Sequence, residues 1–177
     1  MKFIKEVNML KHLEKFHPVV RDINKWFKFL FDRGFKIKYT NFKQNRMMFW
    51  SVFLESTDCI IHVFQDRNEI FVSYAPLIYL IEGNGEYRLK DEFAIQIMIF
   101  YISHGKVFIG SFEKEVYRRR NAQLKTISKL IETYHDSITP CFSKNEFQMK
   151  KDEIEIASRD FNKIQFDKYV LGKKTGY

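Results

Sequence analysis

Four β-type segments joined by short polar links are the feature that most constrains the fold of this chain. Residues 35–40 alternate apolar and polar side chains, and residues 47–55, 59–64 and 69–74 are rich in aromatic and β-branched side chains. An alternation with a period of two is typical of strands with one buried face. Links of only a few residues join strands that run antiparallel. The sequence therefore predicts a four-stranded antiparallel meander that ends at Pro76.

Helical patterns stand on both sides of this meander. Apolar residues recur at three- and four-residue spacing from Pro18 to Gly34, where proline suits the first turn and glycine the end of a helix. Two later patterns predict a buried helix over residues 92–103, capped by Asp91, and a long helix over residues 112–137. We therefore expect an α+β fold, in which the sheet packs one face against the N-terminal helix and the two later helices.

The length of 177 residues fits one domain with an appendage. Residues 1–143 are predicted to form the α+β domain. Residues 144–177 are more polar but carry too many apolar side chains for a free tail. We expect them to form a C-terminal arm that packs on the domain or on a partner. Residues 153–157 alternate like a strand, whereas the apolar spacing from Ile154 to Ile164 fits one helix face, so the conformation of the arm stays open.

Composition narrows the class of protein further. The chain is 45% hydrophobic and 17% aromatic, which excludes disorder for most of its length. No apolar run approaches the roughly 20 residues of a membrane span, and the first 16 residues lack the apolar region of a secretory signal. The two cysteines, Cys59 and Cys141, form no motif. We expect a cytoplasmic protein whose thiols act as small buried hydrophobes.

The net charge of +8 is unevenly distributed. Residues 1–46 carry a net charge of +8, residues 47–143 carry −2 and residues 144–177 carry +2. The basic excess therefore belongs to the helix and strand nearest the N-terminus. The candidate binding patch in this region comprises Arg21, Lys25, Lys28, Lys36 and Lys38. Such a patch binds phosphates by releasing counterions, and a solvated, solubilising surface is the other interpretation.

Motifs for catalysis, metal binding and cofactor binding are missing from the sequence. The run from Gly172 to Thr175 lacks the glycine-rich start of a phosphate loop. Cys59 and His62 stand on opposite faces of a strand, which does not suit a metal site. The turn between the last two strands comprises Asp66, Arg67 and Asn68. Turn chemistry explains these residues better than acid–base catalysis does, so we expect no enzyme activity, no cofactor and no metal.

The segment Ile61–Val72, with the sequence IHVFQDRNEIFV, resembles a hairpin of small bacterial proteins of immunity-like or unassigned type. Those proteins carry an apolar strand, an Asp-Arg turn and a second strand of the Ile-Phe-Val kind. The resemblance extends over about residues 19–142, from the helix that runs into Gly34 to a closing helix over residues 124–142. It implies an α+β sandwich without catalysis, in some cases encoded beside a toxin.

The sequence leads to two main functional hypotheses. The first is a non-enzymatic protein-binding module, immunity-like (toxin-neutralising) or related to phage defence. Such a module blocks the surface of a partner, or of a second copy of itself, with its C-terminal arm or a sheet edge. The alternative is a nucleic-acid-binding accessory protein that uses the N-terminal basic patch. A small enzyme whose site is assembled from scattered residues is a third class.

Overall fold

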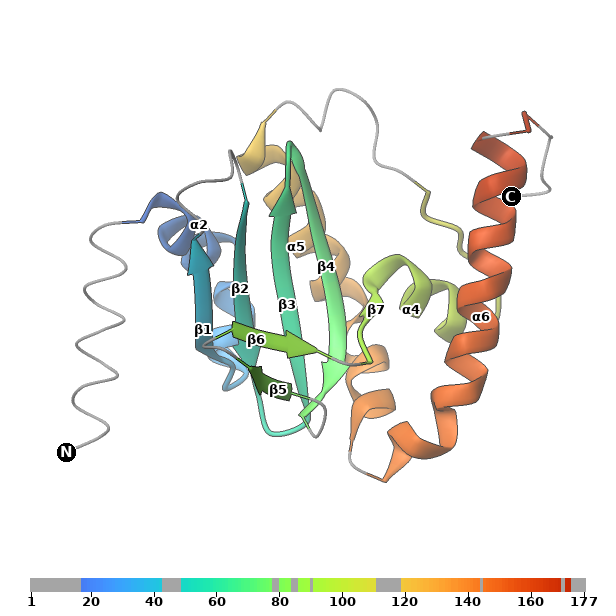
Figure 1. The fold of residues 1–177 in the computed structure, drawn as a ribbon, viewed down its shortest axis with the longest axis horizontal. Coiled ribbons are helices and arrows are strands. Elements are labelled where there is room, and N and C mark those ends of the chain that lie inside the picture. Colours follow the sequence, from blue (N-terminus) through green and yellow to red (C-terminus); the bar gives the residue numbers. More distant parts are fainter. Residues whose placement is uncertain are drawn as a thin grey trace.

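A five-stranded antiparallel sheet organises the chain (Figure 1). The structure is a computed structural model that describes residues 17–42, 49–77, 80–83, 86–89, 91–110, 119–143, 145–169 and 171–172. The strands of the sheet, in spatial order, are β1 (Lys36–Phe42), β2 (Trp50–Glu55), β3 (Cys59–Asp66), β4 (Glu69–Pro76) and β7 (Phe93–Ala94). The predicted α+β fold and meander are therefore confirmed, and the short strand β7 is an addition to them.

Alternation along the strands divides the sheet into a core face and an outer face. The residues that face the core are buried, and they are Val52, Leu54, Ile61, Val63, Val72 and Tyr74. The register shifts at Lys38, because Ile37 pairs with Leu54 whereas Tyr39 pairs with Phe53. Lys38 is therefore an extra residue in β1 and forms a β-bulge, which bends an edge strand and increases its twist.

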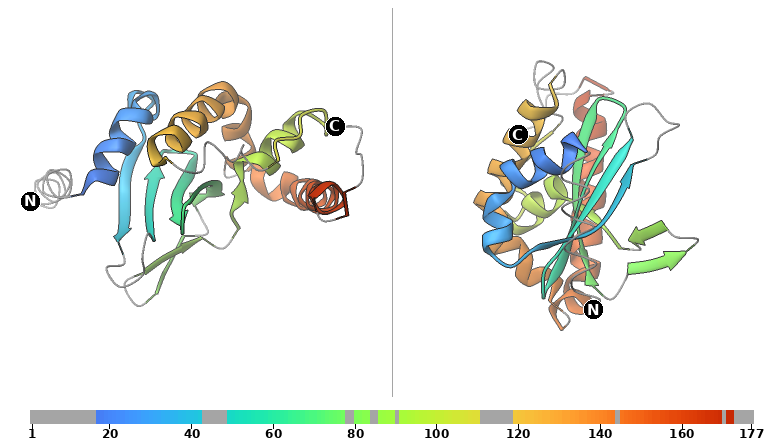
Figure 2. Two further views of the ribbon diagram at one scale, coloured as in Figure 1. Left: turned by 90° about the horizontal axis from the view of Figure 1, so that it is seen from above. Right: turned by 90° about the vertical axis from the view of Figure 1, so that its left-hand side faces the viewer.

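Helices cover one face of the sheet, and a small hairpin lies on the other side (Figure 2). The helices are α2 (Pro18–Trp26), α3 (Lys28–Asp32) and α5 (Arg120–Ile138). The hairpin pairs β5 (Leu80–Gly83) with β6 (Glu86–Leu89). Residues 111–118, over which the sequence predicts the start of the long helix, lie outside the described residues.

The helix predicted from Pro18 to Gly34 is interrupted at Phe27. The hydroxyl of Ser128 on α5 donates a hydrogen bond of 2.6 Å to the carbonyl oxygen of Trp26, which is therefore satisfied from outside the helix. Gly34 ends α3 with φ of +91°, a conformation that glycine adopts without steric cost. The prediction of the helix end is thus correct, and the break reflects a tertiary contact.

The segment before α4 (Ile95–Ile102) differs from the prediction. The N-cap residue is Ala94, which forms no side-chain cap, and Phe93 and Ala94 themselves pair with β4 as β7. Asp91 accepts a hydrogen bond of 3.1 Å from Lys151 of the C-terminal arm instead of capping the helix. The prediction that Asp91 caps this helix is therefore wrong.

Within the C-terminal arm the structure describes one long helix, α6 (Glu146–Tyr169), which follows the 3-10 helix η3 (Thr139–Phe142). Its buried residues Phe147, Ile154 and Phe161 are seven positions apart and lie on one side of the helix. The Phe161 ring packs against Phe100 of α4, with 5.7 Å between the ring centroids. The helical pattern, and not the strand pattern, therefore describes this segment. None of the helices that the structure describes is long and apolar enough to cross a membrane.

Candidate functional site

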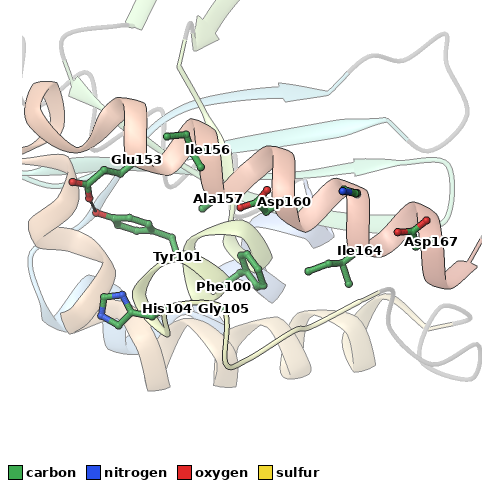
Figure 3. A pocket seen from close by; sticks show the side chains of 11 residues that line it. Phe100, Tyr101, His104, Gly105, Glu153, Ile156, Ala157, Asp160, Ile164 and Asp167 are labelled. Carbon is green, nitrogen blue, oxygen red and sulfur yellow. Dashed lines mark hydrogen bonds between the residues drawn. The ribbon is translucent and has the colours of Figure 1, made fainter. Parts of the chain in front are cut away.

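A groove runs between α4 and α6, and we refer to it as the α4–α6 groove (Figure 3). Its volume is about 560 Å³. Apolar side chains from both helices form part of its lining, among them Phe100 of α4 and Ile164 of α6. Ile156 also lines the groove, and 49% of its surface is exposed. Together with Phe100 and Ile164 it gives the groove an apolar lining bordered by polar side chains, and a combined apolar surface of this kind, rather than one exposed residue, is typical of a binding groove.

Acidic side chains give the groove its electrostatic character. Among the described residues, Glu153, Asp160 and Asp167 line it together with one lysine, Lys163, and one histidine, His104. The Tyr101 hydroxyl donates a hydrogen bond of 2.7 Å to Glu153, and the two side chains point toward each other from α4 and α6 in Figure 3. Burial, followed by this hydrogen bond and the charge of Glu153, raises the pKa of Tyr101. Tyr101 therefore stays a neutral donor that holds one carboxylate of the groove in place.

The helical half of the predicted basic patch lies on α2 and α3. Arg21 and Lys25 are exposed on α2, and the Lys25 ammonium lies 4.9 Å from the Trp26 ring centroid. Lys28 belongs to α3, beyond the break, and forms an ion pair of 2.6 Å with Asp32 one turn away. Exposed pairs of this kind contribute little to stability, and this one neutralises part of the patch.

The two residues of the patch on the strand, Lys36 and Lys38, lie near one carboxylate, that of Glu55. Lys38 pairs with Glu55 of β2 at 3.2 Å, and Lys36 lies opposite Glu55 in the register of the two strands. Glu55 follows the core residue Leu54, so its side chain belongs to the opposite face of the sheet. The five basic residues of the patch thus divide between the helical layer and the other side of the sheet.

Of the predicted turn residues, Arg67 and Asn68 connect β3 and β4, whereas Asp66 is the last residue of β3, and all three are exposed. Arg67 has φ of +57° and is the residue that adopts the left-handed conformation. The carbonyl oxygen of Asn68 accepts a hydrogen bond of 2.7 Å from Gln123 of α5, and that of Arg67 accepts one of 2.5 Å from Gln65. The turn is therefore held by two glutamine side chains.

A cluster made of a histidine, a carboxylate and a hydroxyl group lies on the outer face of the sheet. His62 Nδ1 and the Ser73 hydroxyl both bond to Oε2 of Glu92, at 3.0 and 2.7 Å. The His62 ring is stacked between Phe53 and Phe64, with centroid distances of 4.1 and 4.6 Å. The Ser73 hydroxyl bonds to the carboxylate and not to the imidazole, so this arrangement does not activate a nucleophile. It fastens the segment that leads into β7 onto the sheet.

A second polar cluster is buried in the core beneath α5. His135 lies 3.4 Å from the Tyr74 hydroxyl and 3.2 Å from the Thr139 hydroxyl. Burial and the nearby charge of Arg33 lower the pKa of His135, which favours its neutral form. Burial also raises the pKa of the Cys59 thiol to about 12, so this thiol stays protonated. These groups act as core residues, as the sequence predicts for the cysteine.

Among the residues that the structure describes, no group of three histidine, cysteine or acidic side chains is placed to hold a metal ion. Comparisons of the chain with protein-family models, with curated proteins and with solved structures give no match. The geometry of the chain itself therefore carries the functional argument.

The α4–α6 groove is not apparent from the sequence alone. The seven-residue repeat of Glu153, Asp160 and Asp167 is visible in the sequence, and it was the available signal. A spacing of seven places residues on one face only in a helix. With the conformation of the arm open between strand and helix, the repeat could not be interpreted as an acidic surface.

Proposed function

We propose that this chain is a bacterial, cytoplasmic, non-enzymatic protein-binding module, immunity-like or related to phage defence, and that its α4–α6 groove holds the partner. The exposed Ile156 at the border of a groove of about 560 Å³ is the observation that carries this proposal. Fully burying an exposed aliphatic side chain of this size contributes roughly 1.5–3 kcal/mol, and because Ile156 is 49% exposed, covering the rest of it contributes about half of that. The resemblance of the β3–β4 hairpin to immunity-like proteins supports the functional class.

A pair of matched substitutions on α6 tests the proposal. Ile156→Glu places a charge at the border of the groove, and Phe166→Glu makes the same kind of change at a residue that is 52% exposed and does not line it. The wild-type chain and both variants are used to capture proteins from a lysate of the host, and the recovered proteins are quantified by mass spectrometry. Circular dichroism confirms that both variants are folded.

We expect one protein to be recovered by the wild type and by Phe166→Glu, and to be lost at least tenfold with Ile156→Glu. Recovery that is equal for all three chains, or no recovery above background, contradicts the proposal. Recovery of nucleic acid that disappears with Arg21→Glu and Lys25→Glu, while Ile156→Glu has no effect, establishes the alternative. The alternative has one structural argument, because the Asp22–Arg120 ion pair joins α2 to the start of α5, where another basic residue, Arg119, is exposed.

A further inference from the structure

The carboxylates of the α4–α6 groove form a regular row along α6. Glu153, Asp160 and Asp167 stand seven residues apart, and all three line the groove. Seven residues are close to two helical turns, so the three side chains share one face of the helix. At a rise of about 1.5 Å per residue, consecutive members of the row are about 10 Å apart along the axis. The row therefore presents a periodic negative surface.

Several basic groups of α6 are engaged outside the groove. Lys150 pairs with Glu146 at 3.0 Å, and Lys151 pairs with Asp91 at 3.1 Å. The Lys168 ammonium lies 5.5 Å from the centroid of the Phe108 ring. These contacts leave Lys163 as the lysine that lines the groove. The groove is therefore negative on a protein whose net charge is +8.

We propose that the α4–α6 groove binds an amphipathic helix of another protein that carries lysine or arginine at seven-residue intervals beside aliphatic side chains. This inference rests on the proposed function and adds the chemistry of the partner. A helix laid along α6 has the same axial repeat of about 10 Å, so its cations can follow the row of carboxylates. Its aliphatic residues cover Ile156 and Ile164 between the charges. A β-strand turns successive residues to opposite faces and rises about 3.3 Å per residue, so it cannot place cations on one side at this interval.

Synthetic helical peptides and the full chain provide the test. The first peptide carries three lysines seven residues apart beside leucines, and the second carries glutamates at those three positions. Binding is measured by fluorescence anisotropy with the wild type, with Asp160→Lys, and with Asp152→Lys as the matched control. Asp152 is exposed on the same helix and does not line the groove.

We expect the lysine peptide to bind the wild type and to bind Asp160→Lys about tenfold more weakly, since an attraction becomes a repulsion. Asp152→Lys should change the dissociation constant less than twofold. The glutamate peptide should bind Asp160→Lys more tightly than it binds the wild type. Equal affinity of the lysine peptide for all three chains overturns the inference, as does an equal loss with both variants.

The failure of this inference can be separated from the failure of the proposed function. If a captured partner depends on Ile156 but is indifferent to Asp160→Lys, the protein-binding function stands and the basic-helix partner is wrong. If the capture of no protein depends on Ile156, both the proposed function and the basic-helix partner are wrong. Sedimentation of the isolated chain adds one further outcome: a dimer that Asp160→Lys dissociates makes a second copy of this chain the occupant and overturns the inference.

Discussion

Replacement of Gln123 by methionine should destabilise the protein by removing a side chain that completes the edge of the sheet. Gln123 is 2% exposed. Its Oε1 accepts a hydrogen bond of 2.8 Å from the backbone N–H of Ile70, and its Nε2 donates one of 2.7 Å to the carbonyl oxygen of Asn68. The amide therefore takes the place of a peptide group from a neighbouring strand, on a part of β4 that β7 does not reach.

The magnitude follows from the burial of the two backbone groups. Ile70 is buried, and a buried donor without a partner costs about 1–3 kcal/mol. Asn68 is exposed, so water can replace its lost bond and the cost there is about 1 kcal/mol or less. Methionine is close to glutamine in length and in helix propensity, so neither a cavity nor α5 itself adds a large cost. We expect Gln123→Met to lower the free energy of unfolding by about 2–3 kcal/mol.

Two measurements check this prediction. Urea unfolding is followed by the combined fluorescence of Trp26 and Trp50, of which Trp50 donates its indole N–H to Gln65 of β3 at 2.6 Å. Hydrogen exchange of the Ile70 amide reports the local bond directly. Lys125→Met, an exposed change on the same helix, is the control and should alter stability by less than about 0.5 kcal/mol. A Gln123→Met variant as stable as this control, with unchanged exchange at Ile70, refutes the reasoning.

Two further predictions concern titratable groups. Burial opposes the charge of Glu92, but the hydrogen bond and charge of His62 and the Ser73 hydroxyl outweigh it and hold the pKa of Glu92 below its ordinary value of 4.5. This stabilisation is present above pH 4.5 and is lost as the pH falls through the lowered pKa. Urea unfolding across this range should show a smaller acid-induced loss for Glu92→Gln than for the wild type, and parallel curves contradict this. The thiol of Cys59, buried and with its pKa raised to about 12, should resist a thiol-specific reagent until the chain is unfolded, whereas native labelling at the rate of a free thiol contradicts its assignment to the core.

The sheet was predictable because its signals are local. Each strand of the meander carries its own alternation, and short links leave antiparallel pairing as the only economical connection. The segment before α4 was not predictable in this way. Asp91 has the right chemistry for a helix cap, and only the arrival of Lys151, 60 residues later in the chain, assigns it to an ion pair. The break at Phe27 likewise depends on Ser128, which no local pattern reveals.

The candidate site was less predictable than the fold. Charge arithmetic along the sequence directed attention to the N-terminal quarter, where Lys28 and Lys38 form ion pairs with acidic neighbours. Neither pairing is visible from net charge, since Lys28 bonds one helical turn away and Lys38 bonds across a strand pair. Whether the basic patch binds nucleic acid stays a prediction. The groove required the conformation of α6 and the position of α4, and both are tertiary facts.

The α6 helix also shows why net charge is a poor guide to the charge of an individual surface of this protein. Residues 144–177 carry a net charge of +2, yet the face of α6 toward the groove is acidic, because Lys150 and Lys151 pair elsewhere. At physiological ionic strength the Debye length is about 8 Å, which is shorter than the step of about 10 Å between the groove carboxylates. A docking segment therefore responds to the nearest carboxylate far more than to the +8 of the whole chain. A protein with a net positive charge can thus bind a basic helix, provided that its own acidic side chains gather on one face.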